Sequence, residues 1–122
     1  MSIRTLESGQ TYSFLSNRRT FYLPTKSAEG DIDPTIAQNT ANLLAEKYQS
    51  VILEPVVVYW KSMPDVKSVG MLKLTIFCHM NEALAEANQI VAEACHNAGQ
   101  QSIVYERNGT LIVERITSNQ EK

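Results

Sequence analysis

The sequence contains few of the residues from which functional motifs are usually built. Its 122 residues include 2 cysteines, 2 histidines and 1 tryptophan, and its 5 glycines are isolated from one another. Two cysteines do not make a disulfide framework. Isolated glycines do not make a phosphate-binding loop, which needs several backbone N–H groups close to the phosphate. The sequence therefore predicts a cytoplasmic protein with reduced thiols and without a glycine-rich nucleotide loop.

Positive charge is also sparse. The chain has 11 Lys and Arg against 13 Asp and Glu, a net charge of −2, and the cations are scattered. Because nucleic-acid-binding surfaces normally cluster Lys and Arg, we expect no nucleic-acid partner. No segment approaches the roughly 18 apolar residues that cross a bilayer, and the first residues lack the apolar core of a secretory signal. We therefore expect no membrane partner.

A strand followed by a helix is the clearest pattern that is present. Residues 70–80 alternate between an apolar and a mixed face, which is the period of a half-buried strand. Residues 81–98 carry small and apolar side chains at helical spacing, with acidic side chains away from that stripe. Asn81 is a favourable N-cap, and Gly99 is suited to end the helix.

A hairpin follows that pair, and a second helix precedes it. Residues 101–116 contain Asn108-Gly109, a pair that tolerates the positive φ angles of a type I′ turn. Asp33-Pro34 predicts the start of a helix that ends near Tyr48, because Asp caps and Pro fits the first helical position.

Two further extended segments complete the prediction. Residues 11–24 form either one long bent strand or a small hairpin, and we favour a strand that ends at Pro24. Residues 50–60 are rich in β-branched and aromatic types, which predicts a buried strand. Pro55 cannot donate to a sheet ladder, so it requires a bulge or an edge position. Residues 61–69 are predicted as a turn region.

This order of elements predicts one α+β domain over residues 1–122. We expect a two-layer ferredoxin-like plait (βαββαβ) with an extra C-terminal hairpin strand, in which two helices cover one face of an antiparallel sheet. Residues 1–10 and 117–122 are expected to be flexible. The second sheet face would be partly apolar, and exposed apolar surface usually marks an interface. We therefore expect a homodimer through the sheet face.

Two Cys-His pairs contain donor atoms suitable for zinc, Cys78-His79 and Cys95-His96. The pairs are separated by about 13 helical residues at 1.5 Å each, or roughly 20 Å. Since one ion cannot bridge that distance, we expect no metal, and we expect both cysteines to pack as small apolar side chains.

No set of side chains converges on a reaction, so we predict no catalytic residue and no cofactor. The weak ligand-binding residues are Tyr59, Trp60, Phe77 and His79, which would supply an aromatic wall and one polar side chain. Three functions stay open. The first is a non-enzymatic binding or interaction module that acts as a homodimer. The second is a small-molecule-binding protein or small enzyme with an aromatic-lined cavity that uses His79. The third is an accessory protein that blocks or adapts one macromolecular partner.

Overall fold

The computed structural model describes residues 2–5, 11–15, 17–27, 30–48, 50–62, 65–79 and 83–116. The strands are β1 (Ser2–Thr5), β2 (Thr11–Phe14), β3 (Asn17–Pro24), β4 (Lys26–Ser27), β5 (Gly30–Asp31), β6 (Ser50–Ser62), β7 (Asp65–Cys78), β8 (Ser102–Arg107) and β9 (Thr110–Arg115), and the helices are α1 (Pro34–Lys47) and α2 (Ala85–Asn97). Five strands form an antiparallel sheet in the order β6-β7-β3-β8-β9. The two remaining pairs, β1-β2 and β4-β5, are separate ladders.

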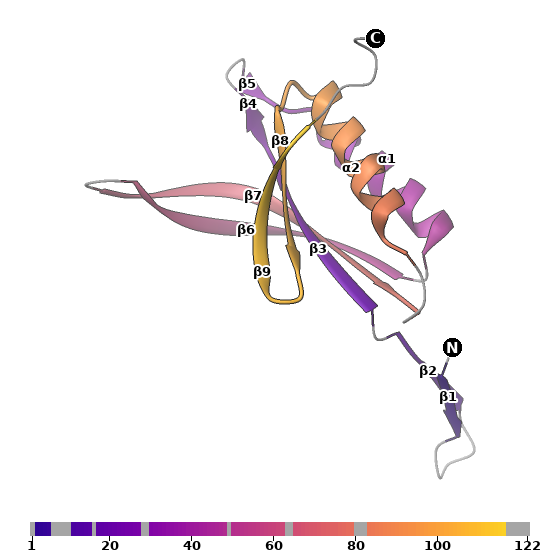
Figure 1. Cartoon of the computed structure of the whole chain (residues 1–122). Coiled ribbons are helices and arrows are strands. Elements are labelled where there is room, and N and C mark those ends of the chain that lie inside the picture. The colour runs from indigo at the N-terminus through magenta and orange to yellow at the C-terminus, as the bar shows by residue number, and fades with distance from the viewer. Residues whose placement is uncertain are drawn as a thin grey trace.

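Both helices lie side by side on one side of this sheet, which confirms the predicted α+β class (Figure 1). Cross-strand pairing places Phe21 of β3 beside Leu74 of β7 and Tyr105 of β8. Phe21 and Leu74 are fully buried, as are Leu44 of α1 and Val91 of α2. The core is therefore the layer between this sheet face and the two helices. We call the opposite face of the sheet the open face.

The start of α1 agrees with the sequence. The carboxylate of Asp33 accepts a hydrogen bond of 3.0 Å from the backbone N–H of Thr35, and Pro34 occupies the first turn. This cap satisfies one of the N–H groups that a helix start leaves without a partner. The hairpin is also confirmed, because Asn108 (φ 54°) and Gly109 (φ 80°) both have the positive φ of a type I′ turn.

The start of α2 differs from the prediction. The helix begins at Ala85, and its N-cap position is Leu84, which makes no side-chain cap. Asn81 lies outside the described residues. The carbonyl oxygens just before the helix are engaged by other elements, because the Tyr48 hydroxyl donates to Ala83 (3.1 Å) and Arg19 donates to Leu84 (3.3 Å). The Leu84 carbonyl also accepts the bond of the helix itself from the N–H of Asn88, so the residues at this boundary are held by both the helix and tertiary contacts.

The region 61–69 was predicted as a turn, and that prediction is wrong. Strand β6 continues to Ser62 and β7 begins at Asp65, with residues 63–64 outside the described part. The two strands form an arm, residues 57–62 and 65–70, that projects beyond the helices (Figure 1). Ser62 pairs with Asp65 and Lys61 with Val66, so the strands run on to within a few residues of each other although residues 61–69 lack the alternation of a strand. Pro55 sits on the edge strand as predicted, and the register passes through it without a bulge.

Residues 11–24 were predicted as one strand, and that is wrong: β2 and β3 are separate strands in different sheets, and only the end of β3 at Pro24 is as predicted. Ser2–Thr5, expected to be flexible, is instead a strand paired with β2. Residues 117–122, also expected to be flexible, lie outside the described residues. No described helix is long and apolar enough to span a membrane.

Candidate functional site

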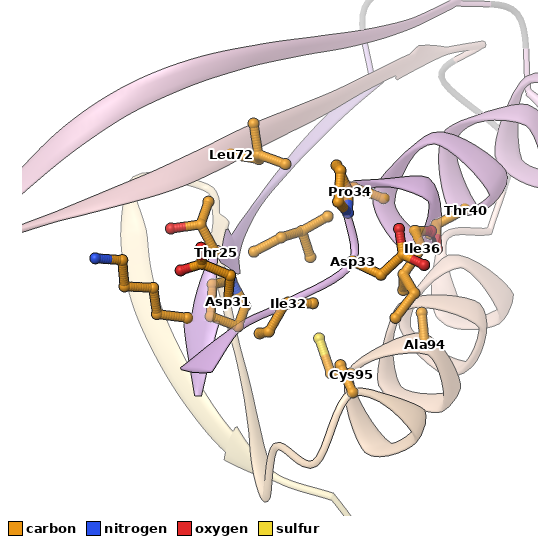
Figure 2. Close-up of a pocket in the computed structure, with 15 residues that line it drawn as sticks. Thr25, Asp31, Ile32, Asp33, Pro34, Ile36, Thr40, Leu72, Ala94 and Cys95 are labelled. Atoms are coloured by element: carbon orange, nitrogen blue, oxygen red, sulfur yellow. Dashed lines mark hydrogen bonds between the residues drawn. The ribbon is translucent and has the colours of Figure 1, made fainter. Parts of the chain in front are cut away.

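A cleft of about 420 Å³ opens between the end of β3, the start of α1 and the C-terminal half of α2 (Figure 2). Its volume lies in the range of small-molecule sites. Its walls are mainly apolar, and its polar side chains gather at the rim; the lining comprises Leu23, Pro24, Thr25, Lys26, Asp31, Ile32, Asp33, Pro34, Ile36, Ala37, Thr40, Leu72, Ala94, Cys95 and Ala98. We call this pocket the cleft.

The rim of the cleft is held by a short chain of hydrogen bonds. The backbone N–H of Ile32 donates to the carbonyl of Thr25 over 2.9 Å. The Thr25 hydroxyl in turn donates to the carbonyl of Gly70 over 2.9 Å. These bonds tie the β4–β5 ladder to β3 and β7. The rim is therefore a supported wall, and the oxygen of Thr25 can still accept a hydrogen bond.

The two rim carboxylates are not equivalent. Asp33 caps α1, and the hydrogen bond from Thr35 lowers the pKa of its carboxyl group. Asp31 makes no hydrogen bond or ion pair within the described part of the chain. Figure 2 shows Asp31 close to Thr25 on one side of the cleft, with Asp33 on another. Asp31 is thus the carboxylate available to a ligand.

Cys95 supplies the sulfur in the wall. Its side chain points from α2 into the cleft (Figure 2), and the residue is buried. Burial raises the pKa of its thiol to about 11. The thiol therefore stays protonated at neutral pH, and it lacks the thiolate that nucleophilic chemistry needs. The chemistry of the cleft favours binding over covalent catalysis.

The predicted site residues lie in two places. Tyr59 and Trp60 line a groove of about 450 Å³ on the open face, at the base of the arm. Phe77 lies on the same sheet face beside Arg18, at the opposite end of β7. Trp60 pairs with Lys67, and Phe77 follows ten residues later, a distance of about 33 Å along the strand. One chain therefore does not bring all four residues around one ligand.

His79 directly follows β7 and is half-buried. Its Nδ1 atom is buried and has no hydrogen-bond partner within the described ranges. Cys78 ends β7 before α2, whereas Cys95 lies near the end of α2. Among the residues that the structure describes, no three His, Cys, Asp or Glu side chains are grouped as metal ligands.

Sequence reasoning did not find the cleft. Its polar groups come from the segment 25–33, which reads as an ordinary polar loop. Its apolar groups come from one strand face and two helices. No spacing motif joins them, since only the packing of α1 against α2 and over the sheet brings them together. Asp33 was identified as a helix cap, which is its structural role.

No protein-family model matches the chain, and no curated protein matches it in sequence. A solved structure has a similar fold, a phage SAM lyase in complex with S-methyl-5'-thioadenosine. The two structures superpose with a TM-score of 0.57 at 9% sequence identity, over 87% of this chain and 95% of the lyase chain. At this identity the comparison shows a shared fold.

Proposed function

We propose that this protein binds a small molecule of nucleoside type in the cleft. The observation that carries the proposal is an apolar cavity of about 420 Å³ with the carboxylate of Asp31 at its rim. A flat, largely apolar base suits the aliphatic walls. An acidic side chain is a common acceptor for ribose hydroxyl groups. The Thr25 hydroxyl oxygen, next to Asp31, offers a second acceptor.

The fold comparison selects the first ligand to test. The lyase of similar fold is bound to S-methyl-5'-thioadenosine, a nucleoside thioether with an apolar group on its 5' side. The uncharged wall of Ile32, Leu72 and Cys95 is compatible with such a group. The proposal covers binding only, because a protonated Cys95 thiol and one rim carboxylate do not make a catalytic set.

Isothermal titration calorimetry with S-methyl-5'-thioadenosine tests this proposal. We expect saturable one-to-one binding, and we expect Asp31→Asn to weaken it about tenfold, because a charged acceptor becomes a neutral amide of the same size. The matched control is Asp65→Asn, which removes an exposed carboxylate on the arm and should change nothing. Absence of binding, or equal effects of the two variants, contradicts the proposal. Incubation with S-adenosylmethionine and chromatography of the products checks for turnover separately.

We propose, as a second function, a homodimeric interaction module that associates through the open face and the arm. The specific observation is a set of exposed apolar side chains on β6, β7 and β9; it comprises Ile52, Val57, Tyr59, Trp60, Val66, Val69, Leu111 and Val113. Contiguous apolar surface on a soluble domain usually marks an interface. Under this proposal the protein is cytoplasmic. The partner on the open face is a second copy of the chain, or another protein that binds the same surface.

Size-exclusion chromatography with light scattering, at micromolar protein, tests the assembly. We expect a dimer for the native chain and a monomer for Val113→Lys, which places a charge on the open face. The control is Leu43→Lys, which changes an equally exposed leucine on the outer side of α1. A native monomer, or dissociation by both variants alike, contradicts association through this face.

For the topology we propose the ferredoxin-like plait with one added strand. The supporting observation is the order β6-β7-β3-β8, with α1 between β3 and β6 and α2 between β7 and β8, followed by β9 at the edge.

A further inference from the structure

The open face contains a second concave site that the cleft proposal does not use. This groove, of about 450 Å³, lies where the arm leaves the sheet, and all five strands of the sheet contribute to it. Its lining consists of Tyr22, Val56, Val57, Val58, Tyr59, Trp60, Lys73, Val104 and Leu111. We call it the arm groove. Three of these side chains are aromatic, and one is charged.

Lys73 is the charged residue, and it is half-buried among apolar neighbours. Its cross-strand neighbours are Tyr22 on β3 and Glu54 on β6. Across the described ranges Lys73 makes no salt bridge, and the exposed Glu54 does not line the groove. An ammonium group beside apolar surface is partly shielded from water, so an anion that reaches it is attracted more strongly than in bulk solvent.

The aromatic side chains of the arm groove indicate that the uncharged part of its ligand is an aromatic ring. Trp60 and Tyr59 come from β6, and Tyr22 comes from β3, so two strands supply ring surfaces to the groove. The valines between them supply an aliphatic surface. Aromatic rings pack favourably against other rings. The single positive charge of Lys73 favours a ligand with one negative charge.

We propose that the arm groove binds a small aromatic molecule that carries a single acidic group. The acid pairs with the ammonium of Lys73, and the ring packs against Trp60 and Tyr22. This inference is independent of the cleft, because the two sites share no lining residue.

Trp60 makes the site directly observable, because it is the only tryptophan in the chain. The probe is 8-anilinonaphthalene-1-sulfonate, an anionic aromatic molecule, and N-phenyl-1-naphthylamine is its uncharged counterpart. Quenching of Trp60 emission reports occupancy of the groove. We expect the sulfonate to bind at one site per chain more tightly than the uncharged probe. We also expect added salt to weaken only the sulfonate.

Three variants test whether the positive charge of Lys73 binds the sulfonate group. Lys73→Met should weaken sulfonate binding about tenfold and leave the uncharged probe within about twofold. Lys73→Arg keeps the positive charge and should retain sulfonate binding. Glu54→Gln removes the neighbouring competing carboxylate and should strengthen sulfonate binding about twofold.

The matched control is Lys61→Met, on the adjacent residue of the same arm but on the opposite strand face from Trp60. It should change neither affinity. Circular dichroism and a thermal midpoint establish that each variant is folded. Equal effects of the Lys73 and Lys61 variants, or equal affinity for the two probes, overturn the proposal. A dimer that excludes both probes overturns it as well, because a second copy then fills the groove.

Discussion

The two faces of the five-stranded sheet are made by the same strands but carry different surfaces. On the helix side, Phe21 of β3 and Leu74 of β7 are fully buried beneath α1 and α2. One residue along, Tyr22 and Lys73 point to the open face and are only half-buried. Alternation along a strand explains this contrast. Residue hydrophobicity alone does not explain the contrast, because the open face also carries exposed valine, leucine and tryptophan side chains.

The open face is itself uneven. Thr20 and Thr75, which pair across β3 and β7, are buried, whereas Val113 on the edge strand β9 is 63% exposed. The cleft and the arm groove also lie on different faces of the sheet. The cleft is enclosed by elements of the helix layer, and the arm groove lies at the base of an extension that no helix covers (Figure 1). Apolar residues on the helix side form the core and the wall of the cleft, whereas most of those on the open face near the arm are exposed.

The largest expected difference between the two faces is in the free energy of unfolding that is lost when an apolar side chain is truncated to alanine. We expect Leu74→Ala to lower the free energy of unfolding by about 2–5 kcal/mol, because the side chain is fully buried and leaves a cavity. The paired change Val113→Ala on the open face, measured in protein diluted until it is monomeric, should cost less than about 0.5 kcal/mol. Urea unfolding of both variants measures the difference. Similar losses in the diluted protein would contradict this contrast, and similar losses only in undiluted protein would show that Val113 is buried in a homodimer.

A smaller effect is expected in the pH dependence of stability. Burial raises the pKa of the Cys95 thiol from 9.0 to about 11. The unfolded chain therefore loses this proton first, so stability is complete below pH 9 and falls as pH rises toward 11. The loss is on the order of 2 kcal/mol. Urea unfolding between pH 7 and pH 11 should show this fall in the native chain and a shallower one in Cys95→Ala.

Tyr48 adds to the same alkaline fall, because burial raises the pKa of its hydroxyl group as well. If native and Cys95→Ala chains have the same slope, the thiol is accessible to water and the cleft is wider than described.

Removing the hydroxyl of Tyr48 tests the contribution of a single hydrogen bond in the helix layer. It donates to the carbonyl of Ala83 over 3.1 Å, just before α2; Tyr48 is buried, whereas Ala83 is exposed. We expect Tyr48→Phe to lower the free energy of unfolding by about 1 kcal/mol. Tyr59→Phe removes a hydroxyl from a side chain on the arm that is 72% exposed, and it should have no measurable effect on the same unfolding curve.

The smallest effect is expected at the ion pair between the helices. Lys47 of α1 and Glu86 of α2 approach to 3.1 Å, but their side chains are 43% and 58% exposed. Water and salt screen such a pair, so Lys47→Ala should change the free energy of unfolding by less than about 0.5 kcal/mol. A larger loss would mean that helix packing depends on surface charge as well as on the buried apolar layer.

Much of the fold could be predicted because its signals are local. Asp33-Pro34 predicted the start of α1 through its own capping chemistry, and Asn108-Gly109 predicted the tight turn between β8 and β9. The helix end at Gly99 (φ +86°) has the same kind of cause, because few other residues adopt that backbone conformation. The antiparallel sheet with two helices on one side follows from the order of these elements.

Other features could not be predicted, for two different reasons. The tip of the arm pairs residues that are close in the sequence, such as Ser62 with Asp65, but residues 61–69 carry no alternation that indicates a strand. The residues at the start of α2 are held by distant side chains, because Arg19 of β3 bonds the carbonyl of Leu84 and Tyr48, just after α1, bonds that of Ala83. Tyr59 and Trp60 were identified as candidate site residues, but their separation from Phe77 and His79 follows from the length of β7.

The sequence alone determined the class of the fold, the cap of α1, the turn between β8 and β9, and the scarcity of catalytic residue types. Each of these depends on residues that are neighbours in the chain. Only the tertiary structure decided where the cleft and the arm groove form. The cleft needs Thr25 and Asp31 held near Cys95, and the arm groove needs Trp60 near Tyr22 and Lys73. Those groups are brought together by strand pairing and helix packing across the whole domain, so no local spacing in the sequence marks either site.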